Sequence, residues 1–372
     1  MTFGFNNVYA IKNRSIRQQA PGRYYFGYWR HTDFFVVICR RIYRGERARQ
    51  RANTIYRKLG SRTMKTAIIG AGISGLYLAR KLSEKGHNVT VFEKESEAGN
   101  KTCSGLFSER ILDFFPEAES LTENKIDSVF LHFPEKSLRI SFSKKFLVMD
   151  HSKLDKIALN LAQKSGAKIE FNRDIKSLPS GFERTIGCDG ADSFVRKNIG
   201  LPPSDFYLGI QSFLDKPANE NFVETWPLDQ GGFIWKIPRG EKTEYGIFSK
   251  PVTSGKKFND FLRKKEIKIK EMKARLIPRD FDMPKNESVA LCGDAAGLNK
   301  PWSGGGVIWG LTAANILIKT FPDFNDYRKK SRRFFLPKIF LARKATSLAY
   351  FLGFKFPFLL PKNYKIESDF LL

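Results

Sequence analysis

The chain has 372 residues, of which 42% are hydrophobic and 14% aromatic, and its formal net charge is +26. This length and composition exclude a disordered or fibrous protein and provide for one large domain or two intertwined ones. The four cysteines and four histidines show no spacing typical of a metal site. We therefore predict reduced thiols, no metal and a cytoplasmic location.

Residues 1–63 differ in composition from the rest of the chain. They carry fourteen basic side chains against Asp33 and Glu46, and twelve of the fourteen are arginines. From Met64 onward lysine outnumbers arginine, and Met64 stands immediately before the first predicted strand. We expect residues 1–63 to be an extension outside the fold, with Met64 as the initiator. The alternative is an arginine-rich arm for nucleic acid, or a transit-like segment.

The stretch from Thr66 to Lys94 predicts a strand, a tight turn, a helix and a second strand. The apolar run 67–69 is typical of a buried parallel strand and leads into the pattern G-x-G-x-x-G, while residues 89–92 predict the second strand. Glycines at this turn let the backbone approach a pyrophosphate at the helix N-terminus, and an acid after the second strand is placed to bind a ribose. The residues expected to contact a dinucleotide are Gly70, Ala71, Gly72, Ser74, Gly75, Glu93 and Lys94.

The next part of the chain predicts an inserted sheet followed by a return to alternating helices and strands. A loop around Cys103 precedes a helical pattern that starts at Ser108. Three short strand patterns cover 129–133, 138–142 and 146–149. An amphipathic helix over 150–164 and a strand over 167–171 follow.

The second half of the chain holds a strand-rich segment and two further glycine-containing motifs. Residues 188–193 read Cys-Asp-Gly-Ala-Asp-Ser, and residues 207–249 are aromatic and strand-like. The lysine-dense stretch 256–275 predicts a helix, with its 264–275 part as a solvated face. A buried strand over 288–291 leads into Gly293 and Asp294, and a glycine-rich loop precedes a helix over 307–319.

The segment 328–361 alternates Arg and Lys with Phe and Leu. Charged residues interrupt it too often for a bilayer-spanning helix. Two interpretations remain: an amphipathic helix that lies in a membrane interface, or a helix that packs on the body with only its charges in water.

Three motifs in this order resemble the FAD enzymes built like para-hydroxybenzoate hydroxylase, over Met64 to about Thr320. They are GAGISG with Glu93, the Asp189-Gly190 pair, and Gly293-Asp294. The resemblance implies that Asp294 binds the ribityl chain of FAD and that Asp189 and Gly190 lie on the pyrophosphate side. A helix that starts near Gly305 would direct its N-terminal dipole at the flavin, which stabilises the anionic reduced ring.

Finer details resemble the geranylgeranyl reductase family, of the archaeal digeranylgeranylglycerophospholipid reductase type. The stretch KTCSGLFSERIL is similar to the family's cysteine loop and implies that Cys103 lies beside the flavin. The stretch PWSGGGV, with Gly304, Gly305 and Gly306, is similar to its glycine-rich loop. The stretch FIWKIP is similar to its substrate motif, although Phe233 replaces a Tyr and Ile237 a Phe. His151 stands where the family commonly has Arg. The catalytic residues implied are Cys103 and Trp235, and the substrate-binding residues are Phe233, Trp235 and Pro238.

This resemblance implies an α/β fold: a Rossmann-like FAD-binding domain of the glutathione reductase type, interleaved with an antiparallel β-sheet substrate domain. The expected FAD-binding segments are 64–126, 150–200 and 286–320, the substrate domain is 127–149 and 201–285, and 321–372 is a basic, aromatic tail. The implied reaction saturates C=C bonds of an isoprenoid lipid by hydride transfer from reduced flavin, with NAD(P)H or a ferredoxin as the electron donor. A peripheral membrane location fits the basic charge.

Two other functions stay open at this point. A flavin monooxygenase or a halogenase-like enzyme uses the same scaffold. A basic module that binds a membrane or nucleic acid, with a vestigial flavin fold, is the alternative from another class, and nucleic acid is the less favoured partner.

Overall fold

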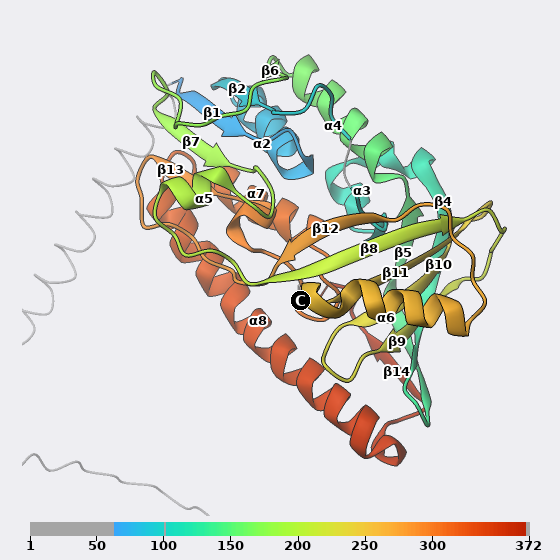
Figure 1. The fold of residues 1–372 in the computed structure, drawn as a ribbon. Helices are drawn as coiled ribbons and strands as arrows, with labels where there is room; N and C mark the ends of the chain where they lie inside the picture. Colours follow the sequence, from blue (N-terminus) through green and yellow to red (C-terminus); the bar gives the residue numbers. More distant parts are fainter. Residues whose placement is uncertain (1–62, 100–101, 370–372) are drawn as a thin grey trace, which may run out of the picture. The chain divides into compact units, whose positions relative to one another are not determined.

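The structure, a computed structural model, describes residues 63–99 and 102–369. These residues belong to Lys58–Leu372, the second of two units into which the chain divides. The predicted extension, residues 1–63, therefore lies outside the described residues except for Thr63. Two sheets with helices beside them make up the second unit (Figure 1).

Sheet A is parallel and has the strand order β13-β7-β1-β2-β6. Its central strand pairs in parallel with β2 on one side and β7 on the other, and all but the first of its residues are buried. A strand buried in this way needs a continuous apolar run, which is what the sequence shows at 67–69. The strands are β1 (Lys65–Ile69), β2 (Asn88–Phe92), β6 (Lys168–Glu170), β7 (Arg184–Gly187) and β13 (Val289–Leu291).

The helices α2 (Ile73–Glu84), α4 (His151–Lys164) and α7 (Val307–Thr320) pack together beside sheet A, with α2 in contact with the other two. The side chain of Asp150 caps α4 by accepting a hydrogen bond from the N–H of Ser152. The shorter elements of this region are α3 (Ile111–Phe114), η1 (Pro116–Leu121), α5 (Phe194–Asn198) and η2 (Gly293–Ala296).

Sheet B has nine strands in the order β12-β8-β11-β10-β9-β4-β5-β14, with β3 also paired to β5. Most neighbours are antiparallel, but β4 pairs with β9 and β14 pairs with β5 in parallel. The strands are β3 (Leu106–Ser108), β4 (Thr122–His132), β5 (Ser137–Met149), β8 (Phe206–Leu214), β9 (Phe222–Pro227), β10 (Phe233–Pro238), β11 (Thr243–Ser249), β12 (Lys273–Pro278) and β14 (Asn363–Ile366).

The two faces of sheet B bury different side chains because successive strand residues point to opposite faces. Ile234 and Ile247 pack under Phe258 of α6 (Pro251–Lys264), the helix that crosses this face in Figure 1. The opposite face gathers Trp235 and Phe248 with apolar residues of β4, β5 and β8. This second face carries Phe233 and Trp235, two of the three residues that the sequence assigns to substrate binding. The third, Pro238, comes three residues after Trp235 on the same strand and therefore belongs to the opposite face.

Helix α8 (Phe324–Lys355) is the longest in the described part of the chain and runs along one side of the second unit, in red in Figure 1. Phe335 and Tyr327 of its first half are buried, and the hydroxyl of Tyr327 donates to the carbonyl of Leu291 at 2.9 Å. The short helix η3 (Pro357–Leu359) and strand β14 follow, so that the chain returns to sheet B.

The two-sheet α/β fold expected from the motifs is confirmed, with four local corrections. The helix expected from Ser108 begins only at Ile111, because Leu106–Ser108 forms β3. The second and third strands expected within 127–149 form one strand, β5, that continues through Lys144 and Lys145. The helix expected over 256–275 is wrong in both bounds: α6 begins at Pro251 and ends at Lys264, and the residues from Lys273 form β12. The C-terminal segment is more than a tail, because β14 belongs to sheet B.

Candidate active site

The turn between β1 and α2 has room only for glycine at two positions. Gly70 has a φ of +104°, and a Cβ there would lie 2.4 Å from the carbonyl oxygen of Cys188. A Cβ at Gly75 would lie 2.1 Å from the carbonyl oxygen of Gly70, because α2 packs directly on the end of the strand. Both glycines therefore perform the packing tasks that they have in dinucleotide-binding folds.

The N-terminus of α2 is available to an anion. Among the described residues, no side chain caps the backbone N–H groups of its first turn, since the N-cap residue is Gly72, and this turn holds no acidic side chain. The buried carboxylate of Glu93 lies beside this turn, where Oε2 accepts a hydrogen bond from the N–H of Ala71 at 2.6 Å and Oε1 from the N–H of Glu95 at 3.1 Å. The fold thus brings together a helix end that is suited to a phosphate and a carboxylate that is suited to a hydroxyl group.

Three other predicted contact residues have different surroundings. Asp189 lies with its backbone against Gly70, but its carboxylate accepts hydrogen bonds from Ser193 Oγ at 2.6 Å and from the N–H of Val195 at 3.0 Å. Burial raises the pKa of this carboxyl group. Lys94 is exposed and 3.8 Å from Glu95. The side chain of Asp189 therefore shapes the loop by capping α5, and Gly190 supplies the positive φ of +84° that this loop needs.

Asp294 lies at the start of η2 and forms an ion pair that the sequence analysis missed. Its Oδ2 is 2.5 Å from Nη2 of Arg275, and its Oδ1 accepts from the side-chain amide of Asn299 at 3.4 Å. Arg275 also donates to the carbonyl of Thr102 at 3.5 Å, next to Cys103. We missed Arg275 because the stretch 256–275 was expected to be helical, whereas β12 places this side chain at the junction of the two sheets.

The glycine-rich loop before α7 is held between η2 and sheet B. Gly304 has a φ of +68°, and a Cβ there would lie 2.7 Å from the ring of Phe248. A Cβ at Gly306 would lie 2.3 Å from Oδ1 of Asn299 and 2.8 Å from Oδ1 of Asp294. The loop therefore brings the N-terminus of α7 within reach of Asp294 and places Gly304 on the aromatic face of sheet B.

Cys103 interacts with a buried histidine and, through it, with a buried acid. The Sγ of Cys103 accepts the N–H of Gly105 at 3.5 Å, and its thiol also interacts with the side chain of His151. Nε2 of His151 is 3.4 Å from Oδ1 of Asp155, one helical turn further along α4. These contacts lower the pKa of Cys103 against the effect of burial and raise the pKa of His151 to about 10. The arrangement therefore favours a thiolate beside an imidazolium.

Trp235 lies on sheet B and is held by a buried polar network. Its ring covers Gly246 on β11, where a Cβ would lie 2.2 Å from the indole. Its Nε1 donates to Oε1 of the fully buried Glu244 at 2.9 Å. Arg239 donates to the other oxygen of Glu244 at 2.9 Å and to the carbonyl of Ser104 at 2.6 Å. This network connects the predicted substrate motif to the cysteine loop.

Burial dominates the titration of Glu244. It raises the pKa of this carboxyl group to about 7, against the lowering effects of Arg239 and Trp235. A buried carboxyl group with a pKa raised toward neutral pH, hydrogen-bonded to the indole of Trp235, is typical of functional sites.

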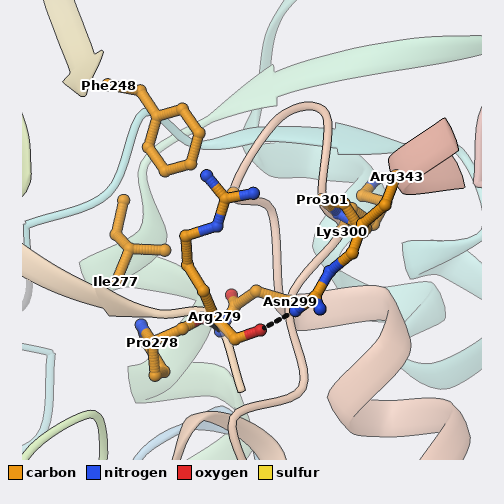
Figure 2. A pocket seen from close by; sticks show the side chains of 9 residues that line it. Phe248, Ile277, Pro278, Arg279, Asn299, Lys300, Pro301 and Arg343 are labelled. Atoms are coloured by element: carbon orange, nitrogen blue, oxygen red, sulfur yellow. Dashed lines mark hydrogen bonds between the residues drawn. The ribbon is translucent and has the colours of Figure 1, made fainter. Parts of the chain in front are cut away.

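A pocket lies where the glycine-rich loop, β11, β12 and α8 meet (Figure 2). Phe248 and Ile277 form its apolar wall, and the basic residues Arg279, Lys300 and Arg343 also line it. In Figure 2 the dashed line marks the hydrogen bond from Arg343 to the carbonyl of Arg279, which is 2.6 Å long. The pocket thus combines an apolar wall with cationic groups.

The residues of this region fit a dinucleotide cofactor. The close approach at Gly70 and Gly75 keeps side chains out of the turn, the first turn of α2 has free donors, and Glu93 supplies an acceptor. No cluster of three or more His, Cys, Asp or Glu that could hold a metal ion occurs among residues 63–99 and 102–369.

Comparisons with known proteins find similar sequences and a similar fold. A family model of an NAD(P)-binding Rossmann-like domain matches residues 68–113. A digeranylgeranylglycerophospholipid reductase of Methanothrix thermoacetophila is 24% identical over 293 residues, which cover 67% of this chain and 75% of the relative. The protein of the same name from Methanosarcina acetivorans is 26% identical over 296 residues, which cover 67% and 72%.

The resemblance to the geranylgeranyl reductases is confirmed. The solved structure of a geranylgeranyl bacteriochlorophyll reductase-like protein from Thermoplasma acidophilum has the same fold, with a TM-score of 0.65 and 19% identity over 78% of this chain and 87% of that chain.

The structure shows which residues His151, the position expected to depart from the family pattern, contacts. The side chain of His151 interacts with both Cys103 and Asp155. A signal for the pair was present in the sequence: His151 and Asp155 are four residues apart on a predicted helix, a spacing that places side chains on one face.

Proposed function

We propose that this protein is an FAD-dependent reductase that saturates C=C bonds in the geranylgeranyl chains of membrane lipids or their precursors. The observation that carries the proposal is the meeting of the glycine-rich loop and the cysteine loop with one aromatic face of sheet B. Gly304 contacts this face at Phe248, and Arg239 joins the cysteine loop to Glu244 and Trp235. The relatives named as lipid reductases supply the substrate class.

The residues that would hold FAD come from sheet A and the elements that follow its strands. The first turn of α2 would bind the pyrophosphate and Glu93 the adenosine ribose. Asp294, oriented by Arg275, would accept hydrogen bonds from the ribityl chain. When bound and reduced, FAD supplies the hydride.

The substrate side of the site has to keep an isoprenoid chain dry and fixed, because an isolated alkene is a poor hydride acceptor. We assign this task to Phe233 and Trp235 on β10, whereas Pro238, predicted for the same role, belongs to the opposite face of that strand. Trp235 cannot turn away without breaking its hydrogen bond to Glu244. The side chain of Phe233 lies 6.1 Å from Trp235 and 5.6 Å from Phe248, measured between ring centroids, so the three rings form one apolar wall.

Saturation of an alkene also needs a proton on the carbon that does not receive the hydride. We propose that Cys103 and His151 hold this proton, with Asp155 stabilising the charged imidazole. In the resting pair the proton lies on the imidazolium of His151 beside the Cys103 thiolate. It would return to sulfur as Cys103 passes a proton to the substrate carbon, which leaves His151 neutral and Cys103 as the thiolate. This assigns Cys103 a catalytic role and makes Asp155 a positioning residue.

The basic residues of the pocket support a carrier with an anionic group. Lys300 is paired with the buried Asp369 at 2.9 Å, so Arg279 and Arg343 are the lining residues that would meet the headgroup of a phospholipid or a diphosphate. We further propose a peripheral location on the inner membrane face, where such a lipid is reached. Among the described residues there is no helix long and apolar enough to cross a membrane. Either NAD(P)H or a ferredoxin would deliver the electrons, and adding each to the oxidised enzyme under anaerobic conditions distinguishes them by loss of the flavin colour.

The test is turnover with dithionite as reductant and a geranylgeranylated glycerolipid as substrate, without oxygen. The proposal predicts a product heavier by two hydrogens for each bond reduced. A product that appears only after oxygen is admitted, and that contains oxygen or halogen, would contradict the reductase and establish the monooxygenase or halogenase chemistry of the same scaffold. Trp235→Phe removes the hydrogen bond to Glu244 while it keeps an aromatic wall, and we expect slower turnover at unchanged flavin content.

A further inference from the structure

Helix α8 has an exposed apolar face opposite the face that it buries. At 100° per residue, the buried residues Phe335, Ile339 and Ala342 lie on one side of the helix. The exposed apolar residues fall within an arc of about 140° on the other side. They are Leu336, 37% exposed, Phe340, 61%, Leu341, 59%, Leu348, 58%, and Phe351, 55%.

The apolar face continues beyond the end of the helix. Phe358 and Leu359 of η3 are 74% and 59% exposed, and Phe356 is 40% exposed. We call the set Leu336, Phe340, Leu341, Leu348, Phe351, Phe356, Phe358 and Leu359 the α8 outer face. Contiguous apolar surface of this kind marks an interaction site on a folded protein.

The body of the protein fixes the α8 outer face in place. Gly353 packs on the ring of Phe133 so closely that a Cβ would lie 2.2 Å from it, and the hydroxyl of Tyr350 donates to the carbonyl of Gly232 at 2.8 Å. Arg343 donates to the carbonyl of Arg279 at 2.6 Å. Because the buried side of α8 is held by these contacts, its outer side cannot turn inward.

The charges around the α8 outer face are of one sign. Between Asp326 and Glu367 the sequence holds eleven Lys and Arg and no acidic residue. Lys344 and Lys355 are exposed and lie within the apolar arc itself. A partner must therefore be anionic and must also accept aliphatic and aromatic side chains.

The need for negative charge and for an apolar environment decides which partner can cover the α8 outer face. A second copy of the chain would bring the same positive charges against this face, which opposes association. Residues 1–62 hold fourteen basic side chains against Asp33 and Glu46, so their net charge has the same sign as that of this face. Nucleic acid would supply phosphates and stacking for the phenylalanines, but it offers no apolar environment for Leu336, Leu341, Leu348 and Leu359. An anionic phospholipid bilayer supplies both the negative surface and the hydrocarbon.

We propose that the α8 outer face lies in the interface of an anionic lipid bilayer, with Phe and Leu side chains below the headgroups and Lys344 and Lys355 at the phosphates. Arg343, next to this face on α8, lines the pocket of Figure 2. The same helix therefore carries both the α8 outer face and one residue of the pocket lining. This inference rests on the proposed function, because it assumes that the substrate is a lipid that reaches the pocket from the bilayer side.

The test uses the full chain and two kinds of vesicle, one of phosphatidylglycerol mixed with phosphatidylcholine and one of phosphatidylcholine alone. We expect cosedimentation with the anionic vesicles, weakened by salt. The double variant Phe340→Ser with Phe351→Ser should partition at least about tenfold less, because two aromatic side chains no longer enter the hydrocarbon. Its control is Val252→Ser with Met272→Ser, which removes exposed apolar side chains outside α8 and should bind like the wild type.

A second pair of variants tests the charges. Lys344→Gln and Lys355→Gln should each lower partition into anionic vesicles about fivefold. The control Lys256→Gln with Lys264→Gln removes exposed lysines of α6 and should leave binding unchanged. Melting temperature and flavin content of each variant show that it is folded.

Several results would overturn the inference. They are equal binding by the phenylalanine variant and its control, no binding of wild type to anionic vesicles, binding of an oligonucleotide in place of vesicles, or a dimer that the phenylalanine variant abolishes. Turnover of detergent-dispersed lipid keeps the two proposals apart. A variant that turns over dispersed lipid but no longer binds vesicles supports both, whereas vesicle binding without any turnover supports the surface and contradicts the reductase.

Discussion

Asp155→Asn tests whether Asp155 keeps His151 protonated and thereby stabilises the thiolate of Cys103. The substitution removes a carboxylate 3.4 Å from Nε2 of His151 and keeps the size of the side chain. At this distance two unit charges interact by about 5 kcal/mol at an effective dielectric constant of ~20, before the desolvation of the buried acid is subtracted. A neighbouring opposite charge moves a pKa by about one to three pH units in folded proteins.

The loss should therefore bring the pKa of His151 down from about 10 toward its ordinary value of 6.5 and let that of Cys103 rise. The assay is the rate of alkylation of Cys103 by iodoacetamide between pH 5 and 10, followed by mass spectrometry of the peptide that contains it. We expect the wild-type rate to persist well below the ordinary thiol pKa of 9.0, and the variant rate at pH 7 to be about tenfold lower or more. Asp113→Asn, an exposed acid, is the control. Identical pH profiles for Asp155→Asn and wild type would refute the reasoning.

Four further outcomes follow from named contacts. His151→Gln should lower the free energy of unfolding most below pH 6.5, because the protonated His151 of the wild type stabilises the folded state fully there. This stabilisation disappears as pH rises through about 10, so the difference between variant and wild type in urea unfolding should be larger at pH 6 than at pH 10. Glu244→Gln keeps a hydrogen-bond acceptor for Trp235 but cannot titrate. The unfolding free energy of the wild type relative to this variant should therefore fall as pH rises from 4.5 to about 7. A difference that stays constant over this range would contradict a protonated Glu244. Asp369→Asn should cost about 3–5 kcal/mol, because the buried Asp369 pairs with Lys300 and Arg110, whereas Asp174→Asn in a surface pair should cost under about 1 kcal/mol. Gly75→Ala should purify without flavin, because its Cβ would lie 2.1 Å from the carbonyl oxygen of Gly70, whereas Gly255→Ala, which meets no atom within 4 Å, should stay yellow.

The nucleotide-binding half of the fold was predictable because its signals are local. The buried strand, the glycines of the turn and the acid Glu93 all lie within thirty residues, and each has a fixed spacing. The same holds for α4, whose apolar residues recur with helical period. These elements have the expected type, with bounds that differ by a few residues.

Sheet B was harder to predict because its strands depend on distant partners. Separate strands were expected over 138–142 and 146–149, but Lys144 and Lys145 between them lie in one long strand. The pairing of this strand with β4 shifts register between Ile126 and Ser128. The lysine-rich stretch after α6 suggested a longer helix, whereas Lys273 to Pro278 forms a strand because β8 offers an edge. In both places the tertiary pairing outweighed the local composition.

Single residues of the candidate site were predictable from the sequence, but most of the contacts between them were not. Cys103, Trp235 and Asp294 were chosen from motifs, but their partners His151, Glu244 and Arg275 come from other elements of the fold. No local pattern announces such pairs, since each depends on how α4, β11 and β12 are placed. The role of the last residues was likewise hidden, because Asp369 becomes a buried ion-pair partner only when β14 joins sheet B.

The central claim is tested most directly by one turnover in the absence of oxygen. Enzyme with reduced flavin is mixed with a geranylgeranylated glycerolipid in excess, and the flavin spectrum and the mass of the lipid are followed in the same sample. The account predicts that the yellow oxidised flavin returns and that one double bond gains two hydrogens for each flavin oxidised. Flavin that stays reduced until oxygen is admitted, with a lipid of unchanged mass, would contradict it.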